Sequence, residues 1–225
     1  MRSLLVLLAL GVLVVAGCGD ASETSTPTGT GLTTTGTKPA GGCGRVDTPA
    51  AGEDGSAEAP TERLDPERTY TLEFRTSCGS FTVTLDQAQS PKAAASLVSL
   101  ARSGFFDGTI FHRVVPGFVI QGGDPTQRGA GGPGYSTRDT PPADARYVKG
   151  VVAMAKSQAE PAGTAGSQFF VVTGADVGLP PDYAIVGTVT KGIGVVERIG
   201  ELGDPATEAP TQTVAITKVT VAEQP

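Results

Sequence analysis

The sequence of 225 residues contains no tryptophan, one histidine and three cysteines. One histidine and scattered cysteines provide no ligand set for a zinc ion, so we expect neither a metal nor another cofactor. Basic residues are also few: 17 lysines and arginines stand against 23 aspartates and glutamates, which gives a net charge of −6. Because a nucleic-acid-binding domain usually carries a basic stripe, we expect no nucleic-acid partner.

The sequence also lacks a hydrophobic run long enough to span a membrane. After Met1-Arg2-Ser3 the chain is apolar from residue 4 to residue 16, well short of the about 20 residues that cross a bilayer as a helix. A basic start, a brief apolar run and small residues before a break are typical of a secretory signal. We therefore assign residues 1–17 to a signal peptide.

Cys18 directly follows the small residues Ala16 and Gly17. This placement resembles a bacterial lipobox, in which the cysteine is lipidated and becomes the mature N-terminus. The resemblance implies an extracytoplasmic protein that is anchored to the bacterial cell membrane through the lipid on Cys18 alone. The alternative is an ordinary signal peptide, whose cleavage at an A-x-A-like site would release a soluble secreted protein.

Residues 18–67 are rich in threonine, glycine, serine, alanine and proline and contain almost no large apolar side chains. Such a segment cannot bury enough surface to offset the entropy of ordering it, and we predict a flexible tether. Residues 68–223 then form one domain of the usual size, about 150 residues. Nothing in this domain suggests an assembly interface, so we expect a monomer.

Two cysteines remain after Cys18. Cys43 lies in the predicted tether, and Cys78 lies at a predicted hairpin turn. Outside the cytosol two thiols can pair, and a disulfide between Cys43 and Cys78 would fix the end of the tether to the domain. The alternative is two unpaired thiols, with Cys78 partly buried at the turn.

The domain shows the pattern of many short strands and two helices. Residues 69–74 and 81–85 alternate apolar and polar side chains around Gly79, which predicts a β-hairpin. Ser90-Pro91-Lys92 is typical of a helix start, and Gly104 of a helix end. Further strands are expected over 148–155, 167–173, 184–189 and 213–221, and a short second helix over 194–202. These elements predict an all-β barrel or sandwich.

The segment from Phe111 to Asp124 is the most informative. It reads FHRVVPGFVIQGGD and places one arginine, one glutamine and several large apolar side chains within fourteen positions. If the segment is a strand, Arg113, Val115, Val119 and Gln121 point to comparable sides, unless the bend at Pro116-Gly117 shifts the alternation. A fixed cation beside an apolar pocket would suit a site that grips a proline ring and acts on the amide bond before it.

This segment closely resembles the signature of the cyclophilins, the peptidyl-prolyl cis-trans isomerases. The motifs SGFFDGT (103–109), VAMA (152–155) and GSQFF (166–170) also match, and the resemblance covers residues 70–221. It implies an all-β fold, a closed eight-stranded antiparallel barrel capped by two α-helices. It also implies an isomerase that rotates X-Pro bonds in proline-containing polypeptides, here assisting the folding of exported proteins.

When the family's roles are assigned to the matching motif positions, the resemblance implies that Arg113 is the catalytic residue. The substrate-binding positions would be Phe118, Val119, Gln121, Ala155, Gln168, Phe170, Leu179 and Tyr183. Val119 stands in place of the family's pocket methionine and Tyr183 in place of a pocket histidine. His112 falls within the family's F-H-R triplet but is not its catalytic group.

Two further positions depart from the pattern of most eukaryotic members. Lys156 stands where they have an asparagine after Ala155, and Gly178 stands where they have a tryptophan before the pocket leucine. Because that tryptophan supports binding of the drug cyclosporin, we expect weak inhibition by cyclosporin.

The chemistry needs neither a nucleophile nor a metal. Rotation about a peptide bond faces a barrier of about 18–20 kcal/mol because the nitrogen lone pair is shared with the carbonyl. At the twisted midpoint the prolyl nitrogen becomes a hydrogen-bond acceptor, and a guanidinium aimed at it binds the transition state better than either planar state. The alternative is a chaperone or module that binds proline-containing segments with little turnover. A hydrolase with His112 as base is disfavoured, since no G-x-S-x-G elbow is present.

Overall fold

The domain opens with a β-hairpin whose inward side chains build the core. The computed structural model describes residues 42–225; the predicted signal peptide, Cys18 and the tether up to residue 41 lie outside the described residues. Strands β1 (Thr69–Thr76) and β2 (Gly79–Leu85) pair antiparallel, so the predicted hairpin is confirmed. Every second side chain is buried, which is the pattern of a sheet with one face on a core.

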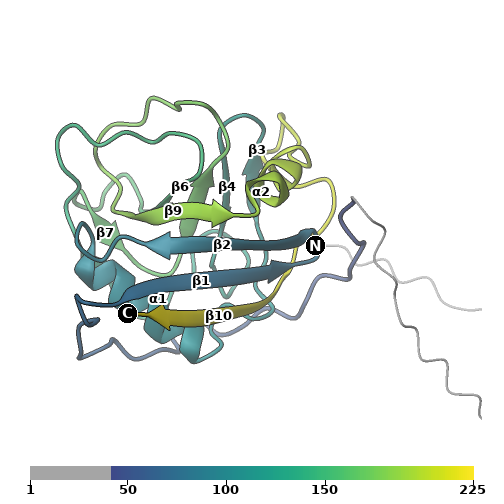
Figure 1. The fold of residues 1–225 in the computed structure, drawn as a ribbon. Helices are drawn as coiled ribbons and strands as arrows, with labels where there is room; N and C mark the ends of the chain where they lie inside the picture. The colour runs from purple at the N-terminus through teal and green to yellow at the C-terminus, as the bar shows by residue number, and fades with distance from the viewer. Residues whose placement is uncertain (1–41) are drawn as a thin grey trace, which may run out of the picture. The chain divides into compact units, whose positions relative to one another are not determined.

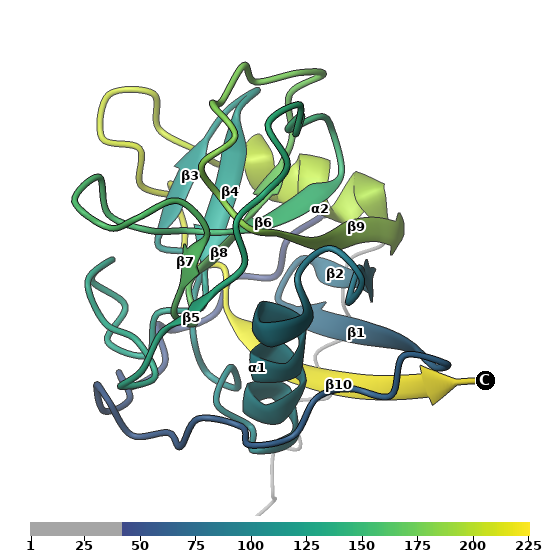
Figure 2. The same cartoon turned by 90° about the vertical axis from the view of Figure 1, so that its left-hand side faces the viewer.

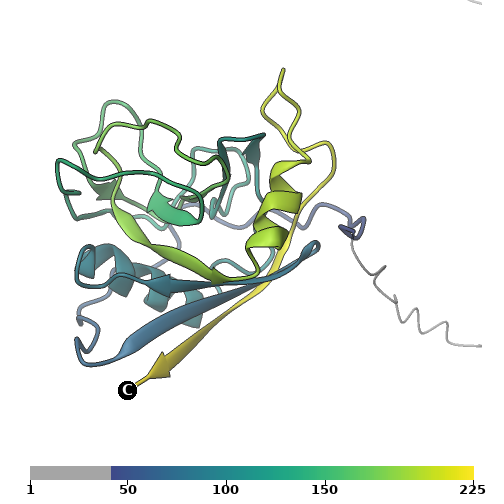
Figure 3. The same cartoon turned by 45° about the horizontal axis from the view of Figure 1, so that its top comes forward.

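Eight strands form one antiparallel sheet in the order β10-β1-β2-β9-β6-β8-β4-β3 (Figure 1). Its other members are β3 (Arg113–Val115), β4 (Val119–Gly122), β6 (Val151–Met154), β8 (Phe169–Val172), β9 (Ile185–Lys191) and β10 (Ile216–Gln224). Two short strands, β5 (Thr137–Arg138) and β7 (Thr164–Ala165), pair separately. The sheet curls, with the hairpin and β10 on one side and the shorter strands on the other (Figure 3).

The sheet is a curled half-barrel, so the prediction of a closed barrel is wrong. Strands β3 and β10 are its two edges. Among the described residues, the segments that lead into them meet in one isolated bridge, Ile110 with Ala215. Strand β3 is only three residues long, and the Val114 N–H donates to the Glu208 carbonyl in the loop before β10. The edge of β3 is therefore partly satisfied by a loop instead of by β10.

Two helices lie at opposite ends of the curled sheet (Figure 2). Helix α1 (Pro91–Arg102) starts at the predicted proline, and α2 (Ile193–Gly200) follows β9. The expected side-chain cap by Ser90 is absent, because its Oγ donates to the Ile185 carbonyl at 2.6 Å. Instead, the buried Asp139 carboxylate accepts the Ala93 N–H at 2.7 Å, which places a negative charge at the helix N-terminus, where it is stabilising.

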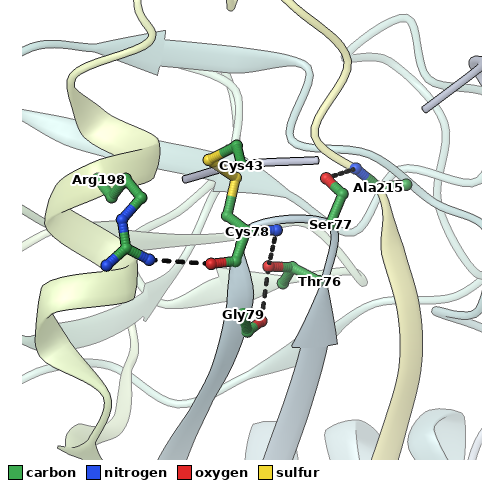
Figure 4. Close-up of a disulfide and its surroundings, with 7 residues drawn as sticks. All are labelled: Cys43, Thr76, Ser77, Cys78, Gly79, Arg198 and Ala215. Carbon is green, nitrogen blue, oxygen red and sulfur yellow. Dashed lines mark hydrogen bonds between the residues drawn. A yellow bond between two sulfur atoms is a disulfide. The ribbon is translucent and has the colours of Figure 1, made fainter. Parts of the chain in front are cut away.

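Residues 42–67, which we call the strap, follow the surface of the domain in place of the predicted flexible tether. The strap begins at a disulfide between Cys43 and Cys78 at the β1–β2 turn (Figure 4). Further along, the N–H groups of Gly52, Gly55 and Ala57 donate to backbone carbonyls of residues 125, 132 and 133 at 2.8–3.0 Å. Backbone hydrogen bonds and the disulfide thus order a segment that contains little apolar surface, and the compact unit extends beyond the predicted start at residue 68.

No helix within residues 42–225 is long and apolar enough to cross a membrane.

Candidate active site

Arg113 and Gln121 face each other across the β3–β4 pair. The register places Arg113 opposite Gln121 and Val115 opposite Val119, and directly opposed residues point to the same face of a sheet. The bend at Pro116-Gly117 is the turn that joins the two strands, so it leaves the predicted alternation intact. The Arg113 Nη1 donates to the Gln121 Oε1 at 3.4 Å.

A line of polar contacts continues from Gln121 into an open groove. The Gln121 Nε2 donates to the Gln168 Oε1 at 3.0 Å, and the Gln168 Nε2 donates to the Gly131 carbonyl at 2.9 Å. Gln121, Gln168, Ala155 and residues 129–136 line this groove, whose volume is about 850 Å³. The predicted polar positions therefore lie together at one surface, with donors and acceptors suited to an extended peptide.

The predicted apolar positions gather beside this surface in one hydrophobic cluster. Its predicted members are Phe118, Val119, Ala155, Phe170, Leu179 and Tyr183. The guanidinium carbon of Arg113 lies 5.9 Å from the centre of the Phe118 ring, and Phe170 pairs with Gln121 across β4 and β8. A cation therefore adjoins an apolar cluster at this end of the β3–β4 pair.

Tyr183 is held in the apolar cluster by its backbone and by its ring. Its N–H donates to the Tyr147 hydroxyl at 3.0 Å, and its carbonyl accepts that hydroxyl's proton at 2.7 Å. Burial raises the pKa of Tyr147, although these hydrogen bonds oppose the shift. Phe170 meets the Tyr183 ring edge-on at 5.5 Å. Tyr183, which stands in place of the family's pocket histidine, is thus fixed by two hydrogen bonds and a ring contact.

Lys156 also packs against Tyr183. Its side chain is 2% exposed and forms an ion pair with Asp182 at 2.6 Å, and its Nζ lies 5.5 Å from the centre of the Tyr183 ring. The lysine therefore ties the loop after β6 to the segment that carries Tyr183. Gly178, by contrast, is exposed in a left-handed conformation with open space around it, so this position packs against no part of the cluster.

Glu208 contacts Arg113 and was not predicted. Its Oε2 accepts the Arg113 Nε–H at 2.7 Å, and both side chains are partly exposed. The two residues are 95 positions apart, and Glu208 belongs to no recognisable motif. Only the folding of the loop after α2 onto β3 brings them together.

Asp124 anchors the loop that forms one side of the groove. Its buried carboxylate accepts the Thr126 N–H at 2.7 Å, the Thr126 hydroxyl at 2.9 Å and the Arg128 N–H at 3.0 Å. Burial alone would raise the pKa of Asp124, but the hydrogen bonds outweigh it and the pKa is lowered. Asp124 is thus a charged anchor whose position fixes where the loop leaves β4.

Within residues 42–225, no three histidine, cysteine, aspartate or glutamate side chains cluster as metal ligands would.

Comparison with known proteins agrees with this geometry. Residues 71–221 match the family model described as cyclophilin type peptidyl-prolyl cis-trans isomerase/CLD. Peptidyl-prolyl cis-trans isomerase-like 1 of Aspergillus oryzae is 36% identical over 155 residues, covering 67% of this chain and 94% of the relative. The probable peptidyl-prolyl cis-trans isomerase A of Mycobacterium bovis is 36% identical over 182 residues, covering 73% and 99%.

A solved structure is also similar. The cyclophilin type peptidyl-prolyl cis-trans isomerase of Cryptosporidium parvum, crystallised in the presence of the dipeptide Ala-Pro, matches with a TM-score of 0.62 and 29% identity. The match covers 68% of this chain and 98% of that protein.

Proposed function

The chain belongs to the cyclophilin-type peptidyl-prolyl cis-trans isomerases, and we propose that Arg113 is the residue that catalyses rotation of the X-Pro bond. The activity itself follows from the family. The observation that supports the role of Arg113 is its position: the guanidinium lies over the Phe118 ring, at the border of the apolar cluster and the polar groove.

The apolar cluster suits the proline ring, and the polar groove suits the chain before it. Phe118 is partly exposed and, together with the buried Val119 and Phe170 of the same cluster, would hold the ring while the preceding carbonyl turns. Gln121 offers an amide that would hold a substrate carbonyl. The structure with Ala-Pro supports proline-containing peptides as the ligand class of this site.

Arg113 would lower the barrier by binding the twisted state. When conjugation is lost, the prolyl nitrogen regains a lone pair that an N–H can reach. A guanidinium keeps its charge and its rigid fork, and the adjoining apolar surface lowers the local dielectric, which strengthens the hydrogen bond. No proton transfer and no covalent intermediate are needed.

Replacing Arg113 tests this role. We expect Arg113→Ala to lower kcat/KM for a short X-Pro peptide by about a hundredfold, the range seen when a donor to a transition state is removed. Arg113→Lys should recover only part of the loss, because an ammonium lacks the fork. A prolyl isomerisation assay measures both.

Arg75→Ala is the matched control, since Arg75 is an exposed arginine on β1, and it should keep wild-type activity. Equal activity of the wild type and Arg113→Ala would refute the proposed role. If both were inactive, the protein would be a module that binds proline-containing segments without turnover.

We further propose that the isomerase acts outside the cytosol as a lipoprotein and assists the folding of exported proteins. The apolar run at residues 4–16 and the small residues before Cys18 support a lipidated N-terminus. The Cys43–Cys78 disulfide supports an oxidising compartment.

Replacing Cys18 tests the anchor. We expect the wild type to fractionate with bacterial membranes and to incorporate labelled palmitate, whereas Cys18→Ser should do neither, because the thioether attachment point is gone. Cys43→Ser is the matched control and should retain the label. A wild-type protein that is unlabelled and soluble would rule out the anchor and favour the secreted alternative.

A further inference from the structure

Glu208 occupies a backbone conformation that glutamate rarely adopts. Its φ angle is +58°, in the left-handed region that favours glycine and asparagine. Its N–H donates to the Asp204 carbonyl and its carbonyl accepts the Val114 N–H, both at 2.7 Å. These bonds dock the loop onto the edge of β3, and glycine could make them with less backbone strain. The backbone therefore does not explain why a glutamate stands here.

The side chain of Glu208 supplies the missing reason. Its carboxylate accepts the Nε–H of Arg113 at 2.7 Å. On other sides the guanidinium donates through Nη1 to Gln121 and lies over the Phe118 ring. Groups from β4, the β3–β4 turn and the loop after α2 therefore fix the plane of one guanidinium.

The choice of nitrogen matters for the reaction. With Nε bound to the carboxylate, Nη1 remains directed towards Gln121, beside the cluster against which a proline ring would pack. A backbone strain that persists only because surrounding contacts hold it is often found at functional sites. A displacement of about 1 Å in a catalytic group can cost about a hundredfold in rate, so a residue that fixes this plane affects turnover.

We propose that Glu208 is a positioning residue for Arg113, which it orients for the twisted state of the X-Pro bond. This inference rests on the proposed catalytic role of Arg113. Glu208 is not among the residues that line the groove, so its effect should fall on kcat and leave peptide binding nearly unchanged.

Glu208→Gly separates this role from a structural one, because the two roles predict opposite results. We expect its melting temperature to equal or exceed that of the wild type, since glycine relieves the left-handed strain. We expect kcat to fall about three- to tenfold, the range for a partly exposed charged hydrogen bond, while the peptide Kd stays within about twofold. Exchange NMR at saturating X-Pro peptide gives kcat, and a separate peptide titration gives Kd.

Glu208→Gln keeps an oxygen that can accept the Nε–H and should recover at least half of the loss in log kcat. Glu201→Gln, at the exposed end of α2, is the matched control and should behave as the wild type. In the double variant Arg113→Ala/Glu208→Gly, the second substitution should change kcat no further, because Glu208 acts only through the arginine.

Three results would overturn the proposal: wild-type or higher kcat in Glu208→Gly, a loss confined to Kd or to melting temperature, or additive losses in the double variant. If Arg113→Ala loses activity while Glu208→Gly keeps it, only this inference fails. If Arg113→Ala is itself fully active, the proposed function fails first.

Discussion

His112 is the only histidine of the chain, and it directly precedes the proposed catalytic arginine in the sequence. Both ring nitrogens are buried and make no hydrogen bond within the described residues. Burial lowers the pKa of His112, the Asp124 carboxylate opposes this, and the Arg113 guanidinium lowers the pKa further. The ring is therefore neutral at pH 7 and acts as packing, which agrees with its assignment as a non-catalytic member of the F-H-R triplet.

This burial predicts a pH-dependent stability. Because the pKa of His112 is lower in the folded state, the unfolded chain binds more protons below about pH 6.5, the ordinary value for histidine. The free energy of unfolding should be highest above pH 6.5 and should decrease as the pH falls from 6.5 towards the folded pKa. Urea unfolding at intervals between pH 7.5 and pH 5.5 measures the slope.

His112→Gln is the control, since glutamine does not titrate, and its slope in this range should be flatter than that of the wild type. Identical slopes would show that other groups cause the dependence. Asp124 does not interfere: its pKa is lowered, so the stability that it contributes is lost only below about pH 3.9, the ordinary value for aspartate.

At the scale of elements, the sequence predicts those strands, helix starts and turns that depend on residues close together along the chain. The hairpin of β1 and β2 and the start of α1 at Pro91 follow from alternation and from a helix-start motif within a few residues. Arg113 and Gln121 face each other because a tight turn joins their strands. These parts of the fold and of the site need no knowledge of distant contacts.

Elements that depend on distant partners are not predictable in this way. The strap has the composition of a disordered segment, but its order comes from groups far along the chain; the Asp54 carboxylate, for example, accepts the Gly132 N–H 78 positions away at 2.8 Å. Glu208 reaches Arg113 over 95 positions. Composition and periodicity describe what a segment can bury, and they do not show which backbone groups will meet it.

At the scale of the whole molecule, the half-barrel is held by more than its sheet. Its edges β3 and β10 do not pair along their length, and the core is covered by helices at both ends (Figure 2). The strap (residues 42–67) connects the β1–β2 turn with the loop after β4. The disulfide links its start to the turn, and backbone hydrogen bonds link its middle to the loop. The hairpin and the groove loop are thus connected through a segment outside the sheet.

The disulfide should therefore stabilise the entire domain. It closes a loop with a sequence separation of 35 residues, and restricting the unfolded chain over such a loop contributes about 3–4 kcal/mol. In a protein of this size that corresponds to a decrease of roughly 6–16 °C in melting temperature when the bridge is removed.

Cys43→Ser is the better variant for testing the disulfide, since Cys43 is partly exposed whereas Cys78 is fully buried in the core. Adding a reductant to the wild type should lower its melting temperature to that of the variant, and the same reductant should leave the variant unchanged. If calorimetry gave equal melting temperatures for the oxidised wild type and Cys43→Ser, the backbone hydrogen bonds alone would hold the strap, and the bridge would add nothing to the stability of the fold.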